Sequence, residues 1–300
     1  MIRAVILIAL VALPHRALAQ ACCAGSSAVT PGRLALHEDA LVGIDAHIAG
    51  AYGSFDPTGT FVTTPSGASE TDFEEDAFAA IRLFERGQAA LLVPLVETRR
   101  TANGDSEFGG GIGDINLSAR YDFVYAGEAR YVPGIGLLVG ITFPTGTPPE
   151  SATKPLATDA TGVGAYQANL GLSFEKTIGP WLFGLSGIVA KRTTRTAEGV
   201  TEALASQWTV LAAAAYTFPS ETAIALSASF TAEGNASVDD MEQADTRRRL
   251  VAISASGLFP ISDHLRLQGA LTVDPPVGSF GINQPSAGIG GTVTAIYAWL

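Results

Sequence analysis

Residues 114–123 have the sequence DINLSARYDF, in which polar and apolar residues alternate without a break. Successive side chains of an extended strand point to opposite faces, so this segment has one apolar and one polar face. The same alternation returns along most of the chain. It is typical of a membrane β-barrel, whose outer surface contacts lipid while its lumen is polar.

Twelve segments with this pattern are predicted to be strands: 40–53, 75–85, 88–99, 113–124, 134–143, 165–175, 181–192, 206–217, 222–231, 248–259, 265–273 and 289–300. The gaps after even-numbered strands are short, apart from 125–133, and the others are longer: 54–74, 100–112, 144–164, 193–205, 232–247 and 274–288. Outer-membrane barrels have short periplasmic turns and long external loops, so an even strand number places both termini in the periplasm. We predict an all-β fold, a transmembrane antiparallel up-and-down barrel of about 12 strands in the cell outer membrane.

Composition and strand length favour this fold over an exported β-sandwich. Hydrophobic residues make up 47% of the 300 residues and charged residues 16%, against roughly 25% charged residues in soluble domains. The apolar runs after the N-terminus are far shorter than the about 18–20 residues that a spanning helix needs. Sandwich strands typically have about 5–6 residues, whereas the predicted strands have the length of spanning strands, about 9–11 residues.

Aromatic residues gather near the short turns and the C-terminus, where they are expected to form a girdle at the periplasmic edge of the membrane. They are Tyr121, Phe123, Phe174, Trp181, Phe183, Tyr216, Phe218, Phe259, Tyr297 and Trp299. Pro94 interrupts the third strand, and we expect a bulge there because proline cannot donate to a β-ladder.

The net charge of −11 argues against binding to nucleic acid, which needs a basic face. Acidic residues cluster at 70–76 and at 239–242. We interpret both clusters as solvated loops or strand ends rather than as cation sites.

The first residues have the pattern of a secretory signal, with Arg3 before an apolar segment and small residues near position 21. We predict three parts: a signal peptide at 1–21, an N-terminal periplasmic tail or plug at 22–38 and the outer-membrane barrel at 39–300. Cys22 and Cys23 are the only cysteines. The position of the cleavage site and the lipidation of Cys22 stay open.

The polar face of the predicted strands supplies candidates for lining the lumen. They are Asp45, His47, Arg82, Asp114, Asn116, Arg120, Asp122, Gln167, Asn169, Glu175, Arg266 and Gln268. Charges of both signs can pair across a narrow lumen and fill it. They can equally line a polar path for solutes. The sequence leaves both interpretations open.

The chemistry-bearing motifs predict no enzyme, metal site or cofactor. The run GGGIG at 109–113 lacks the GK[ST] ending of a phosphate loop and leads into a strand, so a flexible external loop is the better interpretation. The histidines lie far apart, without metal-ligand spacing. A barrel phospholipase needs a serine and a histidine together on the lipid side near the outer rim, and no histidine is placed there.

The sequence GIGDI at 111–115, which continues to Leu117, Arg120 and Tyr121 and is followed by FPTG at 143–146, resembles a bacterial outer-membrane family. The family is labelled for the MetA pathway of phenol degradation, or as transporter-like, and the resemblance covers about 105–150. It implies a barrel that takes up small, often hydrophobic or aromatic compounds. It implies no catalytic residues.

Two functional hypotheses follow. The first is a passive channel for small molecules, motivated by the polar, glycine-rich inner face. The second is a structural or interaction barrel with a filled lumen, whose external loops bind partners. Either barrel is expected to contact outer-membrane lipid and the barrel-assembly machinery, with a small-molecule solute as the further partner of a channel.

Overall fold

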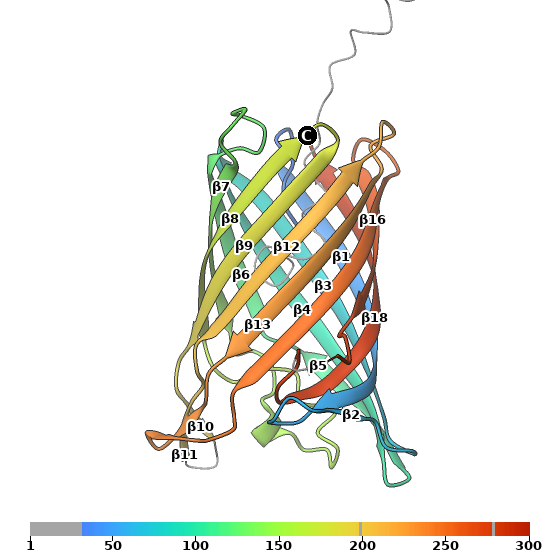
Figure 1. Cartoon of the computed structure of the whole chain (residues 1–300), viewed down its shortest axis with the longest axis vertical. Helices are drawn as coiled ribbons and strands as arrows, with labels where there is room; N and C mark the ends of the chain where they lie inside the picture. Colours follow the sequence, from blue (N-terminus) through green and yellow to red (C-terminus); the bar gives the residue numbers. More distant parts are fainter. Residues whose placement is uncertain (1–31, 198–199, 278–279) are drawn as a thin grey trace, which may run out of the picture.

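The chain forms a closed antiparallel β-barrel in a computed structural model that describes residues 32–300, except for 198–199 and 278–279. Its main sheet has fourteen strands, of which the short β2 (Phe61–Thr63) and β5 (Asp105–Ile112) are additions to a ring of twelve. The ring consists of β1 (Ala40–Phe55), β3 (Ser69–Phe84), β4 (Gly87–Ala102), β6 (Ile115–Val124), β7 (Gly134–Phe143), β8 (Gln167–Ile178), β9 (Trp181–Arg192), β12 (Gln207–Thr217), β13 (Ala223–Glu233), β16 (Arg248–Pro260), β17 (Leu265–Val273) and β18 (Gln284–Trp299). Each strand pairs with its neighbour in sequence, and β18 pairs with β1 to close the ring (Figure 1).

The two rims of the barrel differ as predicted. One rim carries the short connections and the chain end at Trp299, while the long connections lie at the other rim (Figure 1). Asp39 donates its backbone N–H to Trp299 O over 2.8 Å, so the described start of the chain and its end lie together. The first rim is therefore the periplasmic one and the second the external one.

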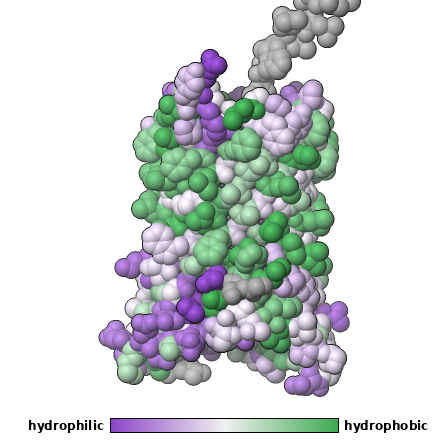
Figure 2. All heavy atoms as spheres, viewed as in Figure 1, coloured by the Kyte–Doolittle hydropathy of each residue, from purple (hydrophilic) through white to green (hydrophobic). Residues whose placement is uncertain are grey.

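The alternation of the sequence becomes an alternation of faces. On β1, Ile44 and Ile48 are exposed on the outer surface, whereas Asp45 and His47 between them face inward and are half-buried. On the face that the space-filling view shows, hydrophobic residues form a broad belt across the barrel wall and polar residues gather at the external rim (Figure 2). This apolar belt is the surface that a closed barrel presents to lipid, and it places the protein in the outer membrane.

The predicted aromatic girdle is present at the periplasmic rim. Trp181 contacts Phe183 and Tyr216, and Tyr216 contacts Phe218, with ring centroids 4.9–6.1 Å apart. Tyr297 and Trp299 form a further edge-to-face pair. These rings are partly exposed, as expected of side chains at a membrane interface.

Three details of the prediction are wrong. The second strand begins at Ser69 rather than at 75, so the acidic stretch 70–76 lies at the external end of β3, a strand end rather than a loop. The predicted loop 100–112 is mostly strand, because β4 and β5 continue as a hairpin around Asn103 and Gly104, both of which have positive φ. This pair fits a two-residue hairpin turn, which requires positive φ at both positions.

The third error concerns the bulge expected at Pro94. β4 keeps an unbroken register with β3 through Pro94, which pairs with Asp76. The irregularity lies on the other side, at 113–114 between β5 and β6, where Gly113 donates its N–H to Pro94 O over 2.8 Å. The neighbouring strand therefore accommodates the missing N–H of Pro94.

Two smaller features complete the fold. A four-stranded sheet of β10 (Arg195–Ala197), β11 (Val200–Ala203), β14 (Ser237–Val238) and β15 (Met241–Glu242) joins two external loops. In the periplasmic half, an apolar cluster packs inside the barrel around Leu34, Leu41 and Phe78. Among the described residues, none forms a helix with the length and hydrophobicity needed to cross a membrane.

Candidate functional site: the barrel lumen

The structure places the sequence-predicted lumen residues on the inner face, with one exception. Asp45 and His47 lie on β1, Arg82 on β3, and the rest on β6, β8 and β17: Asn116, Arg120, Asp122, Gln167, Asn169, Glu175, Arg266 and Gln268. Each is buried or half-buried, whereas its neighbours along the strand face outward. The exception is Asp114, which lies in the break between β5 and β6. That these side chains line a path for solutes stays a prediction.

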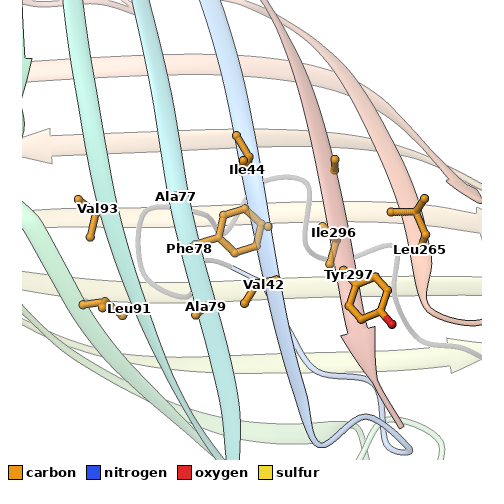
Figure 3. A pocket seen from close by; sticks show the side chains of 12 residues that line it. Val42, Ile44, Ala77, Phe78, Ala79, Leu91, Val93, Leu265, Ile296 and Tyr297 are labelled. Carbon is orange, nitrogen blue, oxygen red and sulfur yellow. The ribbon is translucent and has the colours of Figure 1, made fainter.

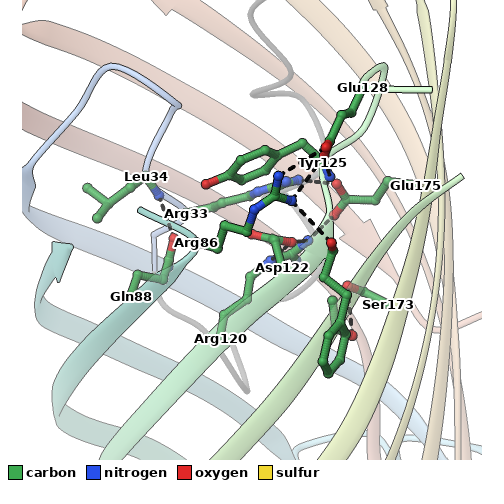
Figure 4. A network of polar contacts seen from close by, with 12 residues as sticks. Arg33, Leu34, Arg86, Gln88, Arg120, Asp122, Tyr125, Glu128, Ser173 and Glu175 are labelled. Carbon is green, nitrogen blue, oxygen red and sulfur yellow. Dashed lines mark hydrogen bonds and ion pairs between the residues drawn. The ribbon is translucent and has the colours of Figure 1, made fainter. Parts of the chain in front are cut away.

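Arg120 is the centre of a buried ion-pair network at the periplasmic end. It donates to Asp122 Oδ1 over 2.6 and 2.9 Å and to Glu175 Oε1 over 3.0 Å (Figure 4). Arg33 reaches the other oxygen of Glu175. Arg120, Asp122 and Glu175 are each less than 10% exposed. A buried charge is tolerated when it is paired and hydrogen-bonded, and all three of these charges are.

The described part of the N-terminal segment, residues 32–39, lies against this end of the lumen. Leu34 N donates to Gln88 Oε1 over 3.2 Å, and Gln88 Nε2 donates to Gly32 O over 3.3 Å. Arg82 Nε donates to Glu38 O over 2.9 Å, and its Nη2 to Ala35 O.

Glu38 anchors the end of the same segment. It is 1% exposed and forms an ion pair with Arg266 of β17. Contacts to β3, β4, β8 and β17 therefore hold residues 32–39 from several sides. Residues 22–31 of the predicted tail or plug lie outside the described residues.

The periplasmic turn after β6 carries an exposed ion pair. Arg86 donates to both carboxylate oxygens of Glu128 over 3.0 Å each, and Tyr125 N donates to the same group over 2.8 Å (Figure 4). These bonds stabilise the charged form and lower the pKa of Glu128 to about 2. Arg86 also lies over the Tyr125 ring, 4.8 Å from its centre.

The middle of the lumen carries an acidic strip, which we define as Asp45, Asp72, Glu74 and Asp76. Asp45 pairs directly with Asp76 across β1 and β3, and His47 pairs with Glu74. Neutral hydroxyl groups contact the strip: Thr294 donates to Asp45 over 3.2 Å and Thr98 to Asp72 over 2.9 Å.

Sequence reasoning missed three of these four residues: Asp72 and Glu74 lie before the predicted start of the strand at 75, and Asp76 lies within that strand but is not among the predicted lumen residues. The signal was present, since acidic residues occupy every even position from 70 to 76. A spacing of two residues puts these side chains on one face of a strand. Glu75, between them, pairs with Ala46 and Leu95 and faces outward.

Small and hydroxyl-bearing side chains line the wall formed by β12, β13, β16 and β17. Thr209 and Thr231 are 3.1 Å apart through their hydroxyls, and Ser254 and Thr272 are 2.6 Å apart. Ser227 also faces inward. This wall is polar and carries no charge at these positions.

At the external end, the charges are paired again. Arg100 Nε lies 3.1 Å from Glu70 Oε2, and Arg192 Nη1 lies 2.7 Å from Glu233 Oε1. Arg100 also donates to Leu156 O in the loop 144–166 over 2.9 Å.

Asp114 holds this loop rather than standing free in the lumen. Its carboxylate accepts the N–H groups of Gly146 and Val163 over 2.9 and 2.7 Å. Thr145 accepts the N–H of Ile115 and donates to Gly113 O. The two motifs that carry the family resemblance thus contact each other, and their first role here is structural.

The glycine run 109–113 is not a flexible loop, because Gly109 to Ile112 belong to β5. A Cβ on Gly109 would lie 2.6 Å from Thr158 Oγ1 and 2.9 Å from its backbone. Glycine is therefore needed where the loop packs against the strand. Glu107 fixes the same loop segment through Leu156 N and the Thr158 hydroxyl.

An apolar hollow of about 540 Å³ lies on the barrel wall at β17, β18, β1, β3 and β4. Its lining is mostly outward-facing, as with Val42, Ile44 and Leu91, and the inward Phe78 ring fills the space beside Gly43 (Figure 3). The hollow thus opens toward lipid and not into the lumen. The described residues contain no group of three or more His, Cys, Asp or Glu side chains arranged to hold a metal ion.

Comparison with known proteins supports the fold. No family model matches the chain, and no curated protein matches it. Among solved structures, the chain is similar to the COG4313 outer membrane channel from Pseudomonas putida F1, with a TM-score of 0.72 and 16% identity over 87% of this chain and 96% of that one.

Weaker similarities reach other outer-membrane barrels. The transport unit of the autotransporter AIDA-I from Escherichia coli matches with a TM-score of 0.45 and 10% identity, over 91% of this chain and 96% of that one. The translocator domain of autotransporter NalP from Neisseria meningitidis matches with 0.47 and 10%, over 91% and 92%. These two similarities carry no argument about function.

Proposed function

We propose that the protein is a passive outer-membrane channel for the uptake of small molecules. The observation that carries this proposal is the inner face of the barrel, where an acidic strip and a wall of hydroxyls surround the middle of the lumen. A barrel that only stiffens the membrane has no need for unpaired charges in its interior, because they cost folding free energy. The similarity in fold to a solved outer membrane channel supports the same proposal.

The N-terminal segment 32–39 is, in this proposal, a plug at the periplasmic mouth. Its polar contacts with Gln88, Arg82 and Arg266 close the path around it. Solute then crosses when the segment leaves its place. The ion pairs of this segment can break while the barrel stays folded, because the segment precedes the first strand.

The cargo that the family resemblance implies, small hydrophobic or aromatic compounds, is part of the proposal. The described middle of the lumen is polar, so we propose aromatic compounds that carry a polar group. Asp114 and its loop would form the external vestibule through which such compounds enter.

Conductance of the purified barrel in planar bilayers tests the proposal. The wild type is compared with a plug-release variant, Arg33→Gln with Glu38→Gln, which removes two ionic contacts of the segment. Glu128→Gln is the matched control, because it removes a charge at the same rim but outside the lumen. We expect higher conductance in the plug-release variant than in the wild type and the control. If none of the three proteins conducts although each is folded, the proposal of a channel is overturned.

A structural or interaction barrel is the second candidate. It is favoured by the sheet of β10, β11, β14 and β15, which orders two external loops beyond the ring. Replacing residues 234–247 with a short Gly-Ser linker should then abolish adhesion of whole cells or vesicles to a surface, with conductance unchanged. Unchanged adhesion would count against this candidate.

A further inference from the structure

We infer that the channel selects for cations, and that the acidic strip on β1 and β3 sets this selectivity. The inference rests on the proposed function and specifies its substrate class: small solutes that carry an ammonium or another cationic group. Asp45, Glu74 and Asp76 are the selectivity-determining residues.

The register of the sheet concentrates negative charge at one level of the lumen. Asp45 lies directly opposite Asp76 on adjacent strands, and both face inward. Side chains in this relation have Cβ atoms about 4.5–5.5 Å apart, and like charges there repel each other. Asp72 and Glu74 extend the strip along β3 toward the external end.

The cationic side chains of the lumen do not neutralise this strip. Arg120 and Arg266 are paired at the periplasmic end, and Arg100 and Arg192 at the external end. Among the described residues, the ion pairs within 4.0 Å include none to the four carboxylates. The strip thus differs from the paired charges at the two ends of the lumen.

His47 is the basic group that faces the strip. It lies opposite Glu74, and its Nδ1 is 2.9 Å from Thr292 Oγ1. A neutral imidazole offsets none of the carboxylates, and an imidazolium offsets one of the four. Carboxylates therefore outnumber basic groups at this level of the lumen in both cases.

A second, independent observation points to a ligand that donates hydrogen bonds. Oδ1 of Asn116 has no partner in the described structure, although the residue is only 7% exposed and faces the lumen from β6. Oδ1 of Asp76 and Oγ of Ser118 are likewise buried without a partner. Asn116 pairs with Leu92 of β4, two residues from the Pro94 that pairs with Asp76, so these acceptors share one side of the lumen.

Buried acceptors need donors. An ammonium group supplies up to three donors and a positive charge, whereas a carboxylate or sulfonate group supplies neither. Rings of Asp and Glu select cations in other pores by the same electrostatics. The uncharged hydroxyl wall across the lumen leaves this preference unopposed.

The test is the reversal potential in a KCl gradient across a planar bilayer. The strip variant is Asp45→Asn with Glu74→Gln and Asp76→Asn. The matched control is Glu75→Gln, which removes one acidic charge from the same strand but from its outer face. All are made in the plug-release background if the wild type does not conduct. We expect K⁺ to be preferred over Cl⁻ in the wild type and in the control, and the permeability ratio to fall at least fivefold in the strip variant.

Each failure has a distinct meaning. A conducting wild type without cation preference, or a strip variant that keeps the wild-type ratio, overturns the selectivity and leaves the channel standing. A barrel that stays silent even in the plug-release background overturns the proposed function itself.

A pair of permanently charged aromatic ions extends the test to organic solutes. Benzyltrimethylammonium and benzenesulfonate are similar in size and opposite in charge, so bi-ionic potentials compare them directly. We expect the cation to be more permeant in the wild type and the difference to shrink in the strip variant. Equal permeability in the wild type would contradict the inference for organic solutes.

Discussion

The periplasmic end and the middle of the lumen use the same carboxylates in opposite ways. At the periplasmic end, Asp122 and Glu175 share Arg120, and Glu38 has Arg266. In the middle, Asp45 and Asp76 lie opposite each other without a cation within ion-pair distance in the described structure. Removing one side chain should therefore have opposite consequences in the two regions.

We interpret the paired charges at the periplasmic end as stabilising the fold and the unpaired charges in the middle as serving the proposed function. Paired buried charges are stable only while both partners remain, because an orphaned charge keeps its desolvation cost. Unpaired like charges destabilise the fold in the absence of a ligand, so their presence is better explained by function than by stability.

The largest effect is expected for Arg120→Ala. It leaves Asp122 and Glu175 buried with fewer cationic contacts, and we expect the free energy of unfolding to fall by about 3–5 kcal/mol. Urea unfolding in phospholipid vesicles measures this, with Arg86→Ala at the exposed pair as the control. An equal loss of unfolding free energy in the two variants would show that the buried network at Arg120 stabilises the barrel no more than the exposed pair at Arg86.

A smaller loss is expected for Glu38→Gln. The glutamine keeps one acceptor and the shape, but Arg266 loses its charged partner, at a cost of about 1–3 kcal/mol. Because residues 32–39 precede the first strand, we expect them to become accessible to trypsin at Arg33 before the barrel unfolds. Continued protection of Arg33 would mean that the backbone contacts alone hold the segment.

A change of opposite sign is expected for Asp76→Asn. The substitution removes a like-charge contact with Asp45, so the free energy of unfolding should rise by about 0.2–1 kcal/mol or stay unchanged. The same vesicle assay applies, with Glu75→Gln as the control. A loss of more than about 1 kcal/mol, the size of a typical hydrogen bond, would show that Asp76 has a stabilising partner after all.

The smallest effect is expected for Glu128→Gln. The folded-state pKa of Glu128 is lowered to about 2, so its contribution to stability is complete above the unfolded value of about 4.3 and is lost as the pH falls toward 2. The variant should match the wild type near pH 2 and be slightly less stable at neutral pH. Equal stability of the variant and the wild type at both pH values would show that the ion pair of Arg86 and Glu128 does not stabilise the fold.

The ring of strands follows from local pattern, which is why the sequence predicts it well. Alternation at 114–123 and at 165–175 reports which side chains meet lipid, and the structure has β6 and β8 there. The start of β3 could not be placed in this way, because acidic residues at 70–76 look like a solvated loop when their inward register is unknown. Strand pairing with β1, a contact between distant residues, fixes that register.

Most of the inward residues were predictable, apart from the β3 members of the acidic strip, but their partners were not. Inward residues such as Arg120 and Arg266 follow from parity, whereas their pairing with Glu175 and Glu38 depends on positions 55 and 228 residues away in the chain. Asp114 shows the same limit. Its carboxylate accepts hydrogen bonds from the backbone amides of Gly146 and Val163, which lie 32 and 49 residues later in the chain.

The seam between β1 and β18 has a consequence for biogenesis. It joins Ala40 to Trp299 and runs to Phe55 and Gln284, so the ring cannot close before the last residues of the chain are present. Until then, β1 and the most recent strand are open edges with unpaired backbone groups, which invite pairing with other chains. Contacts so distant in sequence also form slowly. We therefore expect the nascent barrel to depend on a partner that shields its edges until its two ends meet, and we propose the barrel-assembly machinery for this task.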